Sequence, residues 1–367
     1  MTVAAAQQTE SIEHVRECPV CGSAALEPLP VENLNSHDPA RADRLREKLG
    51  DDFFLFQRAA RCGDCGAVFQ HERPTDEALQ RLYDRFTEAV AKTAPTPATK
   101  FQYLLLHNPQ DYLQGPANAL TFLDRIGALD GVGSLLELRT YGGALPALLH
   151  ERGVEHVEAA TISEFDEHVA RTVYGIEHLR PFTFAAPIER FAPVREQYDL
   201  IVTYEGLTHS KDPGALIRWV SAHLSPGGRA VFLHEPNTPR YRPILPLERV
   251  FNNFHMQLLT ARAVADLARR NSELPFTLYR DYHPSFTAPL YVDLVLGSDA
   301  GRPDADRLDA GDLPSYDLAW WQAWIRQEST RPRAAGIRVK RGVRRVYDAT
   351  AGQLREEARG LGLPGLK

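Results

Sequence analysis

The chain has 367 residues, of which 25% are charged and 43% hydrophobic, and its formal net charge at pH 7 is −6. This length predicts two or three domains, and the acidic balance makes a nucleic-acid partner unlikely, because nucleic-acid binders usually carry a basic excess over a whole domain. The N-terminus shows no basic region followed by an apolar run, and no segment approaches the roughly 18 to 20 apolar residues of a membrane helix. We therefore expect a cytoplasmic protein without a membrane segment.

Four cysteines form two CxxC pairs, Cys18 with Cys21 and Cys62 with Cys65, and a glycine follows each pair. Disulfides are unstable in a reducing compartment, so this pattern favours a metal. Four thiolates suit tetrahedral zinc and leave no open position for substrate, which predicts a structural zinc ribbon. The alternative is four unrelated buried or redox cysteines.

Several regular elements are expected along the chain. Apolar residues at helical spacing predict helices over 75–91 and 116–129, and apolar runs predict strands over 134–138, 156–161 and 180–184. The segment from Tyr198 to Asn237 reads as strand, polar loop, helix, Pro-Gly-Gly turn and strand. Such a unit joins parallel strands, and open α/β sheets bind ligands at the carboxyl ends of those strands.

The segment YDLIVTYEGLTHSKDP…LSPGG…EPN resembles class I S-adenosylmethionine-dependent methyltransferases. The cysteine pairs, beginning CPVCG, are similar to those of a zinc-bearing subgroup that includes sugar C-methyltransferases. The resemblance implies an α/β fold, with a Rossmann-like seven-stranded methyltransferase sheet, an N-terminal zinc ribbon and a helical C-terminal extension. It also implies S-adenosylmethionine as cofactor and methyl transfer to an oxygen or carbon of a small molecule, such as a sugar or secondary metabolite.

In that family an acidic residue and alternating glycines, (D/E)xGxGxG, follow the first strand, where the backbone approaches the cofactor. Glu137 and Gly143 match this pattern, whereas Arg139 and Tyr141 replace two glycines. Thr161 stands where an acidic residue usually holds the ribose. The cofactor-binding residues implied by the resemblance are Glu137, Arg139, Tyr141, Gly142, Gly143, Thr161 and Glu205. The alternative is a methyltransferase-like protein that has lost the cofactor and acts as a binding partner or in cofactor-independent chemistry.

Two histidines are candidate catalytic bases. His209 fits the histidine of the family's VLEH motif, and His255 fits the second histidine of an HEHxxYFS-like stretch. A histidine has a pKa near neutrality and can take a proton from a substrate hydroxyl or carbon acid. Equally, His209 can be a loop residue that caps a helix, and His255 a packed core residue.

The expected organisation is a zinc-binding module over 14–72, a helical linker over 73–120, a methyltransferase-like domain over 121–300 and a helical extension over 301–367. The extension contains three tryptophans and then a basic run over 326–345. This run predicts either a surface for an anionic partner such as a carrier protein, or amphipathic helices whose tryptophans dock on the body.

Overall fold

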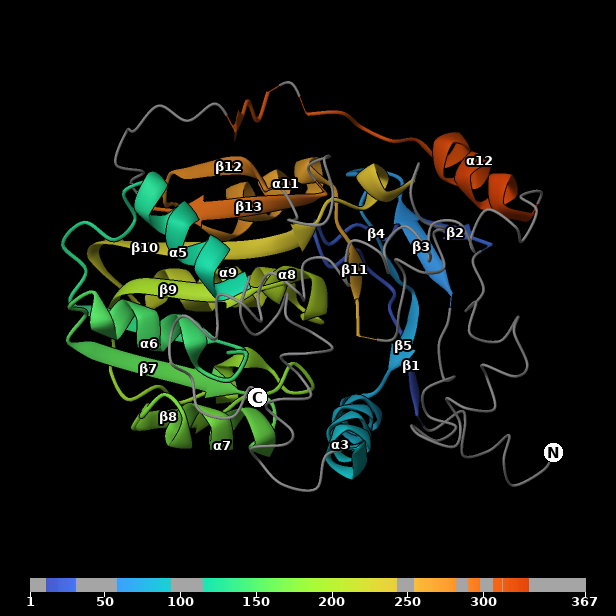
Figure 1. The fold of residues 1–367 in the computed structure, drawn as a ribbon. Coiled ribbons are helices and arrows are strands. Elements are labelled where there is room, and N and C mark those ends of the chain that lie inside the picture. The colour runs from blue at the N-terminus through green and yellow to red at the C-terminus, as the bar shows by residue number, and fades with distance from the viewer. Residues whose placement is uncertain are drawn as a thin grey trace, which may run out of the picture.

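The computed structural model describes residues 11–30, 58–93, 115–242, 254–281, 290–297, 306–311 and 313–329. A large α/β body stands beside a smaller part that contains the four cysteines (Figure 1). The basic run over 326–345, and with it the predicted carrier-protein surface, lies outside the side chains that the structure describes.

An eight-stranded sheet forms the centre of the body, in the order β14-β12-β13-β10-β9-β6-β7-β8. Its strands are β6 (Ser134–Leu138), β7 (His156–Thr161), β8 (His178–Pro181), β9 (Tyr198–Tyr204), β10 (Leu224–Pro236), β12 (Phe276–Asp281), β13 (Tyr291–Leu296) and β14 (Arg307–Leu308). Strands β6 to β10 pair in parallel, and β13 and β12 continue the sheet in antiparallel pairing. The prediction of seven strands is wrong by one, because the short strand β14 pairs with β12 and extends the edge.

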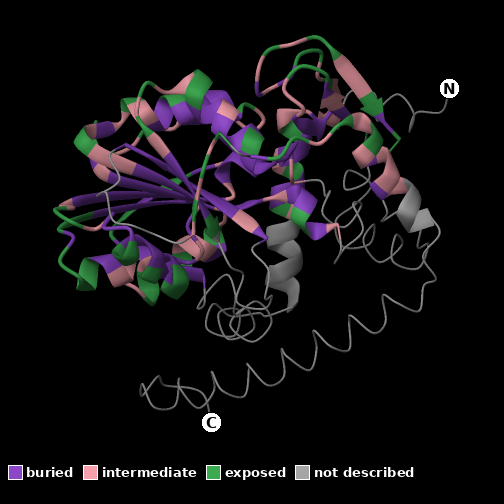
Figure 2. Ribbon diagram, turned by 90° about the horizontal axis from the view of Figure 1, so that it is seen from above, coloured by how far each residue is buried: buried purple, intermediate pink, exposed green. Residues whose placement is uncertain are grey.

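Helices cover both faces of this sheet (Figure 1). On one face α5 (Gly115–Arg125), α6 (Ala144–Glu151) and α7 (Glu164–Thr172) contribute to one apolar core. On the other face α9 (Pro213–Ala222) and α11 (Ala261–Asn271) contribute to a second core. Figure 2 shows the strands between them as almost entirely buried. Burial on both faces explains why the strands read as apolar runs without alternation.

The strand, helix and strand predicted over 198–237 are confirmed as β9, α9 and β10. Asp212 caps α9, since its carboxylate accepts the backbone N–H of Ala215 at 2.7 Å, and Pro213 follows at the first helical position. Both are ordinary signals for the start of a helix. The short helix α8 (Gly206–His209) lies between β9 and α9.

The cysteine-containing part is built on two small sheets. In one, β1 (Ile12–His14) pairs with β5 (Glu72–Pro74). The other has the order β11-β4-β3-β2, with strands β2 (Leu26–Leu29), β3 (Ala59–Cys62), β4 (Val68–Gln70) and β11 (Gln257–Leu258). Strand β11 comes from a distant stretch of the chain that also carries His255, so the two parts of the molecule share a sheet.

Two further helices complete the described structure. Helix α3 (Asp76–Thr93) links the cysteine-containing part to the body, and α12 (Leu318–Ser329) contacts β2. Trp321 and Trp324 of α12 are fully buried, in an apolar cluster with Leu29, Ala59 and Val68 of the cysteine-containing part. None of the described helices combines the length and apolar character that a membrane crossing needs.

Candidate functional site

The four cysteines converge on one point. The Sγ atoms of Cys18 and Cys65 lie 3.6 Å apart, those of Cys21 and Cys62 lie 3.5 Å apart, and all four lie within 4.8 Å of one another. Thiolates bound to zinc at about 2.3 Å in a tetrahedron are separated by similar distances. Burial and the neighbouring thiols raise the pKa of Cys21 to about 11, so a cation is needed to hold four thiolates here. The donor set therefore fits a structural zinc ion.

The loop after β6 keeps a glycine-type backbone although two of its expected glycines are absent. Arg139, Gly142 and Gly143 have φ angles of 62°, 67° and 85°. These angles are left-handed, a conformation that costs an L-residue such as arginine free energy. A Cβ atom on Gly143 would lie 2.7 Å from the Cβ of Ala170, so glycine is required there for α7 to approach the loop.

Arg139 crosses from this loop to the end of β9. Its Nη1 atom donates to the carbonyl oxygen of Tyr204 at 3.0 Å and to Oε2 of Glu205 at 3.2 Å. The guanidinium also lies over the rings of Tyr141 and Phe184, at 5.2 and 5.9 Å from their centroids. Ion pairing and cation–π contacts together hold a positive charge at the centre of the sheet's carboxyl edge.

Glu137 is buried near the end of strand β6, just before the loop. Among the described residues its Oε2 atom finds no hydrogen-bond partner, and burial raises the pKa of its carboxyl to about 8. A buried polar atom without a partner is uncommon in proteins. Its position beside the glycine loop fits a carboxyl group that meets a polar group of a ligand.

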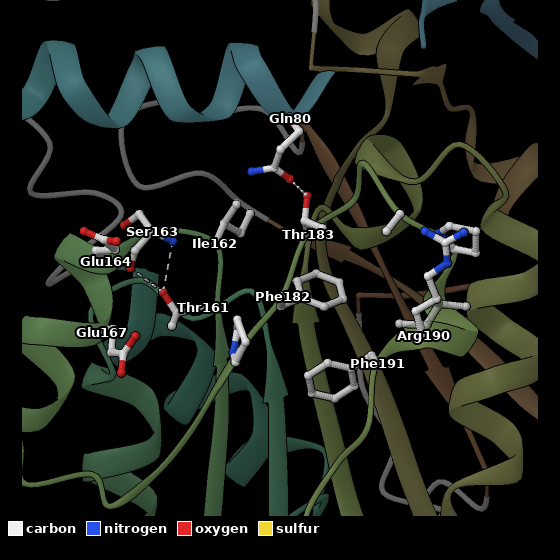
Figure 3. Close-up of a pocket in the computed structure, with 14 residues that line it drawn as sticks. Gln80, Thr161, Ile162, Ser163, Glu164, Glu167, Phe182, Thr183, Arg190 and Phe191 are labelled. Carbon is white, nitrogen blue, oxygen red and sulfur yellow. Dashed lines mark hydrogen bonds between the residues drawn. The ribbon is translucent and has the colours of Figure 1, made fainter. Parts of the chain in front are cut away.

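A cavity of about 280 Å³ lies at the ends of β7 and β8, and Thr161 lines it (Figure 3). The Thr161 hydroxyl donates to the carbonyl oxygen of Ser163 at 3.0 Å. Ile162 and Phe182 form apolar walls, and Gln80 of α3 closes one side by accepting a hydrogen bond from Thr183 at 2.8 Å. The cavity thus combines apolar walls with polar side chains, as pockets for small-molecule ligands do.

The predicted bases His209 and His255 lie together, with ring centroids 5.1 Å apart. Nε2 of His209 lies 3.4 Å from Oε2 of Glu205, and Nδ1 lies 3.4 Å from the hydroxyl of Tyr83. The structure therefore places Tyr83, Glu205 and both histidines in one group, which we call the histidine site. Phe184 stacks on His209 and also contacts Phe182, so the histidine site adjoins the cavity of Thr161.

Burial and the charge of Arg139 lower the pKa of His209 to about 3, so its ring is neutral at physiological pH. For Glu205, burial opposes ionisation, but contact with His209 and the charge of Arg139 outweigh it and hold its pKa well below the usual range. The site thus contains an ionised carboxylate, a permanent cation and a neutral imidazole. A neutral imidazole can accept a proton.

Glu205, His209 and His255 also have ligand atoms within 4.8 Å of one another, a spacing that a metal ion can bridge. The Arg139 guanidinium already neutralises Glu205 at 3.2 Å, however. A divalent cation at this position would be repelled by the arginine. Charge therefore favours an acid–base role for these groups over metal binding.

Two residues of this region are not among the site residues that the sequence predicts. Tyr83 lies within the helix predicted over 75–91, and nothing in the sequence places that helix against His209. Glu235 of β10 is fully buried and accepts hydrogen bonds from the N–H groups of Leu207 and Thr208 at 2.8 and 3.0 Å. These bonds hold helix α8, which carries His209. An acidic residue at the end of an apolar strand was the available signal for Glu235.

The solved structures that resemble the chain include a SAM-dependent methyltransferase from Thermotoga maritima described as a possible histamine N-methyltransferase, with 13% identity, a TM-score of 0.38 and coverage of 54% of this chain and 98% of that one. Streptomyces venezuelae DesVI shows 13% identity, a TM-score of 0.40 and coverage of 54% and 97%. An O-methyltransferase family protein from Burkholderia thailandensis shows 13% identity, a TM-score of 0.40 and coverage of 62% and 64%.

No curated protein sequence matches the chain. The sequence pattern described as "Methyltransferase domain" matches residues 76–271, more than half of the chain. This stretch contains the glycine-type loop, the cavity of Thr161 and all four residues of the histidine site. The chain therefore belongs to the methyltransferase domain family.

Proposed function

We propose that the protein transfers a methyl group from S-adenosylmethionine to an oxygen or carbon of a small molecule, such as a sugar or secondary metabolite. The observation that carries this proposal is the histidine site, in which a neutral His209 lies beside the glycine-type loop of a methyltransferase domain. Open α/β sheets bind their ligands at this edge. The presence of proton acceptors at the same edge supports a substrate that loses a proton during methylation.

The residues of the loop and cavity fit the cofactor in part. A ligand at the loop is supported by the left-handed backbone at 139, 142 and 143 and by the Oε2 atom of Glu137, which no described residue pairs. Arg139 is suited to a carboxylate such as that of the cofactor's amino-acid portion. S-adenosylmethionine supplies an electrophilic methyl group when bound, and the cavity beside Thr161 is the candidate position for its nucleoside.

We assign proton transfer to the histidine site. The Tyr83 hydroxyl lies next to Nδ1 of His209, so a substrate proton can reach the buried His209 through Tyr83. The low pKa of His209 makes it a weak base, which suits proton transfer during methyl transfer rather than before it. His255 is the second candidate base, and its ring contacts His209.

We further propose one structural zinc ion per chain, bound by Cys18, Cys21, Cys62 and Cys65. The matched distances between the sulfur atoms support this proposal. Four sulfur ligands complete the coordination of zinc, so the ion contributes to folding and takes no part in the reaction.

A second candidate function is a methyltransferase-like scaffold that no longer binds S-adenosylmethionine. The Arg139–Glu205 ion pair favours it, because it spans the loop and brings a positive charge toward the place of a sulfonium cation. Thr161 also provides no carboxylate for the ribose hydroxyls. In this case the protein serves as a binding partner or uses other chemistry.

Titration calorimetry with S-adenosylmethionine and S-adenosylhomocysteine separates the two candidates. We expect binding to the native protein, and mass spectrometry of a freshly purified sample is expected to detect either compound. Absence of binding at millimolar cofactor, together with binding gained by Arg139→Gly/Tyr141→Gly, would establish the scaffold instead.

Substitution of the histidines tests the chemical step. With a substrate in hand, His209→Gln and His255→Gln are expected to lower kcat by roughly 100-fold or more if each acts as a base, with unchanged cofactor affinity. A variant that retains full kcat excludes that histidine as the base.

A further inference from the structure

Gln70 connects the cysteine-containing part to the segment that carries His255. This residue is fully buried at the end of β4. Its backbone N–H donates to the carbonyl oxygen of Met256 at 2.9 Å, and its side-chain Nε2 donates to the carbonyl oxygen of His255 at 2.8 Å. One residue therefore satisfies two consecutive carbonyl groups beside the histidine site.

The same residue belongs to a continuous ladder that begins at the cysteine cluster. Strand β3 ends at Cys62 and pairs with β4, where Ala59 lies opposite Gln70. Strand β4 in turn pairs with β11, where Gln257 lies opposite Phe69. The cysteine cluster and the backbone of His255 are thus joined through adjacent strands of one sheet.

A second set of contacts fixes the loop that follows His209. Arg73 of β5 donates to the carbonyl oxygen of Lys211 at 2.8 Å, and Gln257 donates to that of Ser210 at 3.2 Å. The Lys211 ammonium also forms ion pairs with Glu13 and Asp76, at 3.3 and 2.7 Å. The cysteine-containing part therefore contacts both segments that carry the histidines.

We propose that Gln70 is a positioning residue for the histidine site, and that the cysteine cluster determines the place of His255 through it. The proposal rests on the methyl transfer proposed above for its effect on kcat, but the position of His255 can be measured without activity. The hydrogen bonds of Gln70 given above run to the backbone of His255 and Met256 and not to the glycine-type loop. Its effect is expected on the chemical step and not on cofactor binding.

The physical basis is the loss of one hydrogen bond to the His255 carbonyl oxygen. Loss of the Nε2 donor leaves the His255 carbonyl without that bond and frees the backbone to move. A displacement of about 1 Å at a catalytic group can lower a rate by about 100-fold. We therefore expect Gln70→Met, which keeps the length of the side chain and removes the donor, to lower kcat by roughly 10- to 100-fold with an unchanged KM for S-adenosylmethionine.

The decisive measurement is NMR of the histidine side chains in the zinc-loaded full chain. The His255 resonances are assigned by their loss in His255→Gln. Gln70→Met is expected to shift the His255 and His209 resonances and to leave in place those of histidines far from Gln70, such as His150 and His178. Ser134→Ala is the matched control, because it removes a buried hydroxyl that bonds Asp199 at the opposite end of β6.

Removal of zinc by a chelator is expected to shift the same two histidines in the native protein. Gln70→Asn, which keeps the amide on a shorter chain, serves if Gln70→Met does not fold. Unchanged His255 resonances in a folded Gln70 variant would overturn the proposal, as would equal shifts in Ser134→Ala. If the native protein proves inactive, methyl transfer fails, and the resonances still decide the role of Gln70.

Discussion

The cysteine cluster and the glycine-type loop, the two proposed ligand sites, are built in different ways. The cluster uses four sulfur atoms, and each must come from a particular side chain. The loop offers backbone, and its left-handed angles persist with an arginine at position 139. Sites built from side-chain donors thus depend on residue identity, whereas sites built from backbone depend on conformation. The two regions are therefore expected to respond differently to single substitutions.

The largest effect is expected at the cysteine cluster. Cys62→Ser removes one of four ligands and should abolish the single zinc ion per chain, with a loss of several kcal/mol in the free energy of unfolding. Elemental analysis and thermal unfolding measure both. Ser23→Ala, in the same turn as Cys18 and Cys21, is the control and should change stability by less than about 1 kcal/mol. An unaltered melting temperature in Cys62→Ser would show that the cysteines do not stabilise the fold.

The next largest effect is expected at Arg139, whose side chain forms an ion pair although its backbone is left-handed. Arg139→Met leaves Glu205 without its cation in a largely buried site and should cost roughly 3 kcal/mol of unfolding free energy. The control is Arg171→Met, which breaks an exposed ion pair with Glu167 and should cost about 0.5 kcal/mol or less. Denaturant unfolding distinguishes these values, and equal losses would contradict a special role for the Arg139–Glu205 pair.

Substitution of Gly143 separates the cost of a left-handed backbone from the cost of close packing. Gly143→Ala imposes a left-handed conformation and a Cβ contact with Ala170, whereas Gly153→Ala, at φ of 95°, has no atom within 4 Å of the new Cβ. The second variant should cost about 1 kcal/mol for conformation alone, and the first roughly 1 to 3 kcal/mol more for overpacking. Thermal unfolding of the two variants gives the difference. Equal costs would mean that α7 can move away from the loop.

The smallest effect concerns pH. The pKa of Glu137 is raised by burial from 4.5 to about 8, so its contribution to stability is present below pH 4.5 and is lost as the pH rises through 8. Glu137→Gln should flatten the decline of melting temperature between pH 5 and pH 8 by a few degrees. Part of the decline should remain, because burial also raises the pKa of Glu235 to about 7. A variant with the native pH dependence would assign the whole decline to other groups.

Local signals predicted much of the fold. Strands β6 and β7 have the predicted bounds, and the helix predicted within 198–237 is present as α9, because apolar runs and helix caps act over a few residues. The predicted third strand over 180–184 is wrong in its bounds. Strand β8 is His178–Pro181. Phe182 and Phe184 lie beyond its end, where they contact each other and line a cavity.

Contacts between distant parts of the chain could not be predicted from local sequence signals. The sequence pointed to both histidines, but their proximity depends on β11, a two-residue strand that pairs with β4 from a distant part of the chain. The Arg139–Glu205 pair likewise requires that β6 and β9 be neighbours in the sheet. Such pairings depend on the whole topology rather than on a window of residues.

The left-handed Arg139 has a consequence for how relatives are recognised. A search that scores the letters of the loop counts Arg139 and Tyr141 as two lost glycines, while the signs of the φ angles at 139, 142 and 143 are those of a glycine-rich turn. Exchange between glycine and arginine at position 139 therefore needs no new backbone path, only a carboxylate such as Glu205 within reach. Relatives of this protein can therefore carry different residues in the loop and keep one backbone conformation.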